Sequence, residues 1–144
     1  CKKYDEIVFC GYGEPTLRLD TIKEVSKKIK EAGGKVRLNT NGHGNVINKR
    51  NILPELKGLV DSISISLNAD TAEAYDRIVR PLPGLRNEIY DRVKEFISEA
   101  KKHIPEVQAT IVTHQEGVDE EMCEDISKNE FDVKYRPRRY NIVG

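Results

Sequence analysis

A short glycine-containing loop carries the clearest potential for chemistry in the sequence, and its residues are Gly11, Tyr12, Gly13, Glu14 and Pro15. It directly follows an apolar run, as a loop at the end of a buried strand does. The glycines let the backbone approach a ligand closely, while the proline restricts the conformation of the residue before it. Glu14 and exposed backbone carbonyls would form an acceptor-rich pocket that suits an ammonium group rather than a phosphate. The alternative is a tight strand-to-helix turn with a solvated glutamate.

Polar or glycine-rich clusters also follow the other predicted strands, at residues 39–45, 66–70, 113–117 and 136–140. In parallel α/β folds the ligand lies at the carboxyl ends of the strands. One such loop would mean little, because turns need glycine and asparagine anyway. The succession of clusters therefore predicts a single shared ligand-binding face.

Three of these segments, in chain order, resemble motifs of radical S-adenosylmethionine enzymes. Residues 11–15 resemble the GGEP-type motif that binds the amino group of the methionyl moiety, with Tyr12 in place of the second glycine. Thr40-Asn41-Gly42 resembles the TNG end of the following strand, and residues 64–69 resemble the strand whose end contacts the ribose or the methionine carboxylate. More narrowly, residues 10–18, 39–45 and 64–69 are similar to the radical S-adenosylmethionine proteins linked to TatD-type nucleases.

The resemblance implies a cofactor-binding set made of Gly11, Tyr12, Gly13, Glu14, Pro15, Asn39, Asn41, Ser66 and Asn68. It assigns Glu14 to the methionyl amine, and Ser66 with Asn68 to the ribose or carboxylate. It further implies a full-length enzyme in which a reduced [4Fe-4S] cluster cleaves S-adenosylmethionine, and the 5'-deoxyadenosyl radical abstracts hydrogen from an unidentified substrate. Because Glu14 would face a cleft, folding is expected to tolerate its loss.

The sequence departs from that family in lacking its CxxxCxxC cluster loop. The three cysteines, Cys1, Cys10 and Cys123, are widely spaced and fit neither a disulfide framework nor a metal-binding CxxC pair. Cys10 is expected to be a small core residue, and Cys123 to lie in a helix. We therefore expect an internal fragment, truncated at its N-terminus, that binds no cluster or other metal and is inactive alone.

Two other functional classes remain open from the residues alone. A non-redox βα-barrel enzyme could use Glu14, Asp70, His43 and His114 in hydrolysis or phosphate-ester binding, and a non-catalytic binding module is the third reading. His103 is expected to interact with the carboxyl end of its helix. Arg80, Arg136 and Tyr140, like Tyr12, could contact a substrate or be half-buried amphipathic side chains.

The elements that must position these residues alternate between strand and helix patterns. Consecutive apolar runs predict parallel strands over residues 4–10, 35–39, 59–67, 106–113 and 131–136. Apolar positions three and four apart predict helices over residues 19–32, 52–59, 71–79, 87–102 and 119–129, the third capped by Asp70 with Glu73 at the capping-box position. The fold class is α/β, a parallel-stranded partial (β/α) barrel of about five βα units in one domain over residues 1–144.

Composition excludes some classes of partner. Lys and Arg total 24 and Asp and Glu total 24, so the net charge is zero and nucleic-acid binding is not favoured. No apolar run approaches the roughly 20 residues that span a bilayer, and no leader is seen, so a cytoplasmic protein without a membrane partner is expected. The strand at residues 4–10 would leave an unpaired edge, which predicts dimerisation along it.

Overall fold

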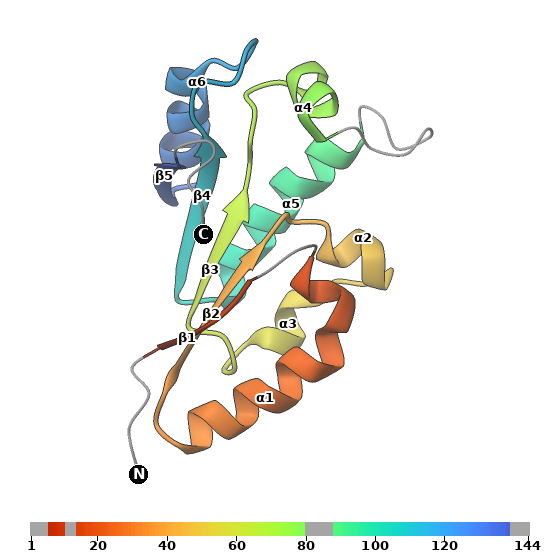
Figure 1. The fold of residues 1–144 in the computed structure, drawn as a ribbon, viewed down its shortest axis with the longest axis vertical. Helices are drawn as coiled ribbons and strands as arrows, with labels where there is room; N and C mark the ends of the chain where they lie inside the picture. The colour runs from red at the N-terminus through yellow and green to blue at the C-terminus, as the bar shows by residue number, and fades with distance from the viewer. Residues whose placement is uncertain (1–5, 11–13, 80–87, 139–144) are drawn as a thin grey trace.

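The computed structural model describes residues 6–10, 14–79 and 88–138 of the chain. They include five strands, namely β1 (Glu6–Phe9), β2 (Lys35–Thr40), β3 (Ser62–Ser66), β4 (Glu106–Val112) and β5 (Lys134–Arg138). The strands are parallel and pair in the order β1-β2-β3-β4-β5, so strands adjacent in sequence are neighbours in the sheet (Figure 1). Helices alternate with the strands, as crossovers between parallel strands require. The predicted fold class, a partial parallel (β/α) barrel, is confirmed.

Most helices follow the apolar stripes of the sequence. The two longest, α1 (Leu19–Glu31) and α5 (Ile89–His103), match the predictions closely, and α4 (Ala72–Val79) begins one residue late. The helix predicted over 52–59 is reduced to α3 (Leu53–Leu56). Its predecessor, α2 (Gly44–Asn48), lies in a segment predicted to be a loop. The last predicted helix divides into α6 (Glu120–Asp125) and a π-helical turn (Ile126–Glu130).

The two faces of the sheet differ sharply in polarity. One face packs under the helices, and its buried side chains, each at most 1% exposed, include Val36, Leu38, Ile63, Ile65, Ala109 and Ile111. Each fully buried aliphatic side chain contributes about 1.5–3 kcal/mol through removal from water. Since successive residues of a strand point to opposite faces, the intervening residues, among them Arg37, Asn39, Ser64, Gln108 and Thr110, lie on the other side. The sheet thus has an apolar outer face and a polar inner face.

The first strand is more exposed than the sequence predicts. A strand buried on both faces is expected there, yet Glu6 and Val8 are exposed, and Val8 retains 41% of its accessible surface. Cys10, expected in the core, is exposed as well. The reason is position, because β1 is an edge strand of the described sheet and pairs only with β2.

Two local predictions at the carboxyl half are also wrong. Asp70 does not cap α4; the Thr71 hydroxyl accepts the Ala74 N–H (3.1 Å) instead, while the Asp70 carboxylate accepts the Asp119 N–H (3.1 Å). The fifth strand begins at Lys134 rather than residue 131, because Phe131 ends the π-helical turn and Asp132 is left-handed (φ 54°). Arg136 therefore lies in the middle of its strand rather than at its end.

No helix in residues 6–10, 14–79 and 88–138 is both long and apolar enough to cross a membrane.

Candidate functional site

Glu14 lies at the centre of a polar network where β1 and β2 end. The Thr16 N–H (3.3 Å) and the Thr16 hydroxyl both donate to Oε2 of Glu14. The Thr40 hydroxyl donates to the same oxygen (2.5 Å), and the Asn41 N–H donates to Oε1 (2.9 Å). These four residues are called the Glu14 corner below. Hydrogen bonds to a charged acceptor are stronger than neutral ones, so the carboxylate is fixed in place.

This network changes the expectation that folding tolerates the loss of Glu14. The donors come from two segments, the 3₁₀ turn Pro15–Arg18 that Glu14 caps and the end of β2. The carboxylate therefore joins the first strand-end loop to the second. Removing it would leave the buried Thr40 hydroxyl and the Asn41 N–H without their acceptor.

The Thr40-Asn41-Gly42 sequence is explained residue by residue. Thr40 donates to Glu14 and its Oγ1 accepts the Gly42 N–H (3.1 Å), while Oδ1 of Asn41 accepts the His43 N–H (2.9 Å). Gly42 has φ 82°, and a Cβ there would lie 3.1 Å from side-chain carbons of both Ile65 and Val93. A side chain is thus opposed by both the backbone conformation and the packing.

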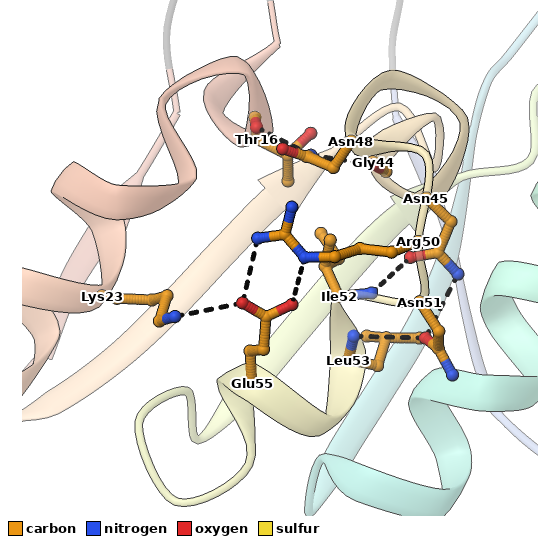
Figure 2. Close-up of polar contacts among 10 residues, drawn as sticks. All are labelled: Thr16, Lys23, Gly44, Asn45, Asn48, Arg50, Asn51, Ile52, Leu53 and Glu55. Carbon is orange, nitrogen blue, oxygen red and sulfur yellow. Dashed lines mark hydrogen bonds and ion pairs between the residues drawn. The ribbon is translucent and has the colours of Figure 1, made fainter.

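The helix α2 is hydrogen-bonded to Thr16 of the same corner (Figure 2). Nδ2 of Asn48 donates to the carbonyls of Thr16 (3.2 Å) and Gly44 (2.8 Å), and Thr16 is fully buried. A Cβ on Gly44 would lie 2.6 Å from Cδ1 of Ile52, so α2 packs tightly on the segment that leads to α3. Both the 3₁₀ turn Pro15–Arg18 and the helix α2 therefore hold the corner in place.

A cluster of charged side chains links α1 with the segment that joins α2 to α3. Figure 2 shows Arg50 and Lys23 converging on the carboxylate of Glu55, at 2.8 Å from Nε of Arg50 and 3.0 Å from Nζ of Lys23. The hydrogen bonds from Arg50 and then Lys23 lower the pKa of Glu55 to about 2. The cluster ties α1 to the segment between α2 and α3.

His43 lies next to the corner as a neutral hydrogen-bonding partner. Its Nε2 is 2.7 Å from the hydroxyl oxygen of Tyr75 on α4, a side chain with no exposed surface. Burial lowers the pKa of His43, an effect that the negative charge of Glu14 partly opposes. Burial also raises the pKa of Tyr75. At neutral pH both groups are uncharged, so His43 links α4 to the β2 loop.

The end of β3 supplies the next group of predicted ligands. The Leu67 and Asn68 N–H groups donate to the Thr110 carbonyl at 2.9 and 3.3 Å, and Asn68 is left-handed (φ 64°). The side chains of Ser66 and Asn68 are half-buried, and neither hydrogen-bonds another residue that the structure describes. Both side chains retain their capacity to bind a ligand.

Asn39 has an unsatisfied polar atom on the inner face of β2. Its Oδ1 is buried and finds no hydrogen-bond partner among the described residues. A buried acceptor without a partner costs about 1–3 kcal/mol, which a bound donor would offset. Asn39 is thus a candidate ligand-binding residue, and its assignment to the cofactor stays a prediction.

Most of the remaining predicted residues fall outside the part of the chain that the structure describes. Gly11, Tyr12, Gly13, Arg80 and Tyr140 lie outside the described residues. Pro15 begins the 3₁₀ turn after Glu14.

Of the acid and histidine set of the hydrolase reading, His43 lies near Glu14, whereas His114 and Asp70 bond other residues. His114 is exposed, and its N–H donates to Glu120 (3.0 Å), whereas Asp70 bonds the start of α6. The described residues contain no group of three or more His, Cys, Asp or Glu side chains placed to hold a metal ion. His103 lies in the last turn of α5 with Nε2 3.9 Å from Oε2 of Glu99, in line with its predicted local role.

The described cysteines are in contrasting environments. Cys10 is exposed at the end of β1, while Cys123 is buried in α6, as predicted. Burial raises the pKa of the Cys123 thiol to about 12, so it stays protonated and cannot serve readily as a thiolate ligand. Cys1 is not among the described residues.

Comparison with known proteins agrees with the arrangement of strands and loops. The family model described as the Radical SAM superfamily matches residues 1–128. The chain belongs to the radical S-adenosylmethionine superfamily. It is 33% identical over 125 residues to the protein named "Putative glycyl-radical enzyme activating enzyme MJ1227" of Methanocaldococcus jannaschii, an alignment that covers 86% of this chain and 49% of that relative. The chain thus spans about half the length of this curated relative. No solved structure matches it significantly.

Sequence reasoning missed the partners of Glu14. Thr16 and Thr40 were not predicted as site residues, although both place the carboxylate. Only Thr40 could have been recognised from the sequence, because it ends an apolar strand that is expected to lie beside the loop of Glu14. Nothing in the sequence around Thr16 indicates that its side chain turns back on Glu14.

Proposed function

We propose that this chain forms the S-adenosylmethionine-binding wall of a radical S-adenosylmethionine enzyme, with the ligands of its [4Fe-4S] cluster outside the chain. Membership of the superfamily supports this reading. The observation that carries it at residue level is the Glu14 corner, a fixed carboxylate at the ends of two parallel strands. The substrate of the whole enzyme is not identified by these residues.

The residues present fit the methionyl part of the cofactor. Oε1 of Glu14 accepts one hydrogen bond from the described residues, that of the Asn41 N–H, and a carboxylate oxygen can accept two. It can therefore accept a further donor, such as an ammonium group. Asn41, Ser66 and Asn68 surround the strand ends on β2 and β3, where Ser66 and Asn68 would meet the ribose or the carboxylate.

The division of labour follows from these contacts. When bound, the reduced cluster and S-adenosylmethionine supply the hydrogen-abstracting radical chemistry. This chain would orient the cofactor by binding its amine at Glu14 and its polar groups at β3.

The cysteines do not fit the cluster. One described thiol is buried and held neutral, the other is exposed, and the sequence has no CxxxCxxC motif. We therefore expect the 144-residue chain alone to bind no cluster and to be inactive. Anaerobic reconstitution followed by optical spectroscopy tests this; stoichiometric cluster absorbance with this chain would contradict it.

The class of radical reaction has two candidates. The loop sequences support our narrower assignment to the group linked to TatD-type nucleases. The relative's name favours a second candidate, activation of a glycyl-radical enzyme. A glycyl radical detected by electron paramagnetic resonance on a partner enzyme, formed only with the full-length protein and S-adenosylmethionine, would favour the second.

The direct test of the proposal uses the full-length protein under anaerobic conditions. Iron and sulfide analysis, followed by titration with S-adenosylmethionine and detection of 5'-deoxyadenosine, should show a cluster, binding and cleavage. A full-length protein without cluster or S-adenosylmethionine binding would overturn the proposal.

The exposed β1 edge supports a further proposal, self-association of this chain. Glu6–Phe9 pairs only with β2 in the described sheet, and Val8 is an exposed apolar side chain on it. Unpaired strand edges invite pairing with another chain. Sedimentation of the isolated chain should show a dimer that Val8→Lys weakens, whereas a monomer at all concentrations would contradict the proposal.

A further inference from the structure

A second group of polar side chains lies on the inner face of the sheet and includes none of the four residues of the Glu14 corner. A cavity of about 170 Å³ on this face is lined by Arg37, Asn39, Ser64, Gln108, Thr110, Arg136 and Arg138, called the arginine face below. The register places Ser64 beside Gln108 and Thr110 beside Arg136. Since strand neighbours in register share a face, these side chains line one surface across β2 to β5.

The charge of this lining is of one sign. It holds three arginines and no carboxylate. Arg37 is partly engaged, because its Nε donates to Oγ of Ser62 (3.1 Å) and lies 3.8 Å from the carboxylate of Glu6. Another acid, Glu106, lines a smaller neighbouring cavity together with Lys134. The cavity itself therefore attracts anions.

Arg136 and Arg138 are its uncommitted cations. Both are exposed, and neither forms an ion pair or a side-chain hydrogen bond with any other residue in the described part of the chain. They are two positions apart on β5, so they share a face with their Cα atoms about 7 Å apart. Guanidinium groups at that spacing can both reach one oxyanion, and their planar forks match carboxylate and phosphate oxygens.

The neutral lining adds hydrogen-bonding capacity. Nε2 of Gln108 donates to Oγ of Ser64 (2.5 Å), which leaves the serine hydroxyl proton free to donate to a ligand. Thr110 is only 4% exposed. Oδ1 of Asn39 is buried without a described partner and could accept from a ligand hydroxyl or amine. The cavity therefore combines cations with neutral groups that can orient a ligand.

The cavity shares Asn39 with the predicted cofactor contacts, and the rest of its lining extends along the inner face. Ser64 and Arg136 each lie two residues before the end of their strand. Glu14 and Asn68, by contrast, lie beyond the strand ends. A group held by Arg136 would thus lie deeper along the inner face than the methionyl moiety, whereas Arg138 ends its strand.

We propose that the arginine face binds an anionic group of the enzyme's substrate, a carboxylate or a phosphate, through Arg136 and Arg138. The proposal rests on the proposed function, in which the substrate must lie within reach of a cofactor bound at the carboxyl ends of these strands.

The test is calorimetric titration of the full-length protein at low salt with inorganic phosphate and, separately, citrate. The variants are Arg136→Gln and Arg138→Gln. Arg92→Gln on the exposed side of α5 is the matched control, because it removes the same charge elsewhere. Loss of a charge-assisted hydrogen bond should weaken one or both probes about tenfold in the first two variants and leave the control unchanged. Preference for phosphate or for citrate distinguishes the two sources of the anion.

S-adenosylmethionine is titrated in parallel, and its affinity should not change in these variants. If the variants weaken S-adenosylmethionine and phosphate competes with it, the arginines bind the methionyl carboxylate and the proposal is overturned. Equal affinity of both probes for wild type and variants, or no binding of either, also overturns it. If phosphate binding depends on the arginines while S-adenosylmethionine does not bind at all, the proposed function fails and the anion site stands.

Discussion

The Glu14 corner and the arginine face are both polar, and they are built in opposite ways. At the corner, a single charge is held by four donors from two segments, beside a glycine that leaves no room for a side chain. On the arginine face, two charges are exposed and have no partner among the described residues. The corner is thus organised before any ligand arrives, whereas the arginine face depends on a ligand for its partners. This difference suits a cofactor that every turnover needs and a substrate that comes and goes.

The largest effect is expected for Gly42→Ala at the corner. The new Cβ would meet Ile65 and Val93 at 3.1 Å on a left-handed backbone. Strain of about 1–2 kcal/mol and overpacking of about 1–3 kcal/mol should together lower the free energy of unfolding. Urea denaturation measures the loss.

Gly58→Ala is the matched control for that variant. Gly58 has the same φ of 82°, but a Cβ there meets nothing within 4 Å. Gly58→Ala should lose stability through backbone strain alone. The difference between the two losses of unfolding free energy therefore measures the cost of overpacking at Gly42. Equal losses would mean that the corner is not tightly packed.

A smaller loss is expected for Thr40→Val, which keeps the shape and removes the hydroxyl. Glu14 would lose a donor and the Gly42 N–H its acceptor, at a cost of about 1–3 kcal/mol. The same change at Thr110, equally buried on the arginine face, should cost less because its hydroxyl makes no hydrogen bond with the described residues. Thermal unfolding of both variants measures the two losses. A larger loss of stability in Thr110→Val than in Thr40→Val would contradict the contrast between the two sites.

The smallest effect is a pH dependence of stability that comes from His43, which lies next to the Glu14 corner. The folded-state pKa of His43 lies below its ordinary value of 6.5. The neutral ring therefore stabilises the fold fully above pH 6.5, and this contribution is lost as the pH falls through the folded-state pKa. In His43→Gln the stability profile should be flatter between pH 7 and pH 5. Identical profiles for wild type and variant would show that His43 does not titrate with folding.

Local patterns predicted the long helices and the order of elements, because α1 and α5 each bury one apolar stripe. They failed where tertiary position decides the outcome. β1 has an apolar sequence but is an edge strand, and α2 is joined to Thr16 by a long-range hydrogen bond from Asn48 that no local pattern predicts. β5 begins late because the π-helical turn extends to Glu130, and Arg136, predicted as the last residue of the strand, lies in its middle.

The candidate site was predictable in form but not in its connections. Glu14 and the TNG segment were found from their types and their places after apolar runs. Thr40 and Asn41 donate to Glu14 because β1 pairs with β2. That pairing brings Glu14 into contact with residues that lie 26 and 27 positions later in the sequence. The position of Arg136 and Arg138 on the inner face could be found only from the strand register. The predicted start of this strand was wrong, so the alternation of side chains between the two faces could not be used.

The central claim, that Glu14 binds the methionyl amine, is tested most directly by removing each partner in turn. Full-length wild type, Glu14→Gln and the exposed control Glu116→Gln are titrated anaerobically with S-adenosylmethionine and with its analogue carrying a hydroxyl in place of the α-amino group. Wild type and control should bind the analogue about 10 to 150 times more weakly than the cofactor, whereas Glu14→Gln should discriminate only slightly between them. The same discrimination in all three proteins would contradict the claim and leave Glu14 as a support of the fold alone.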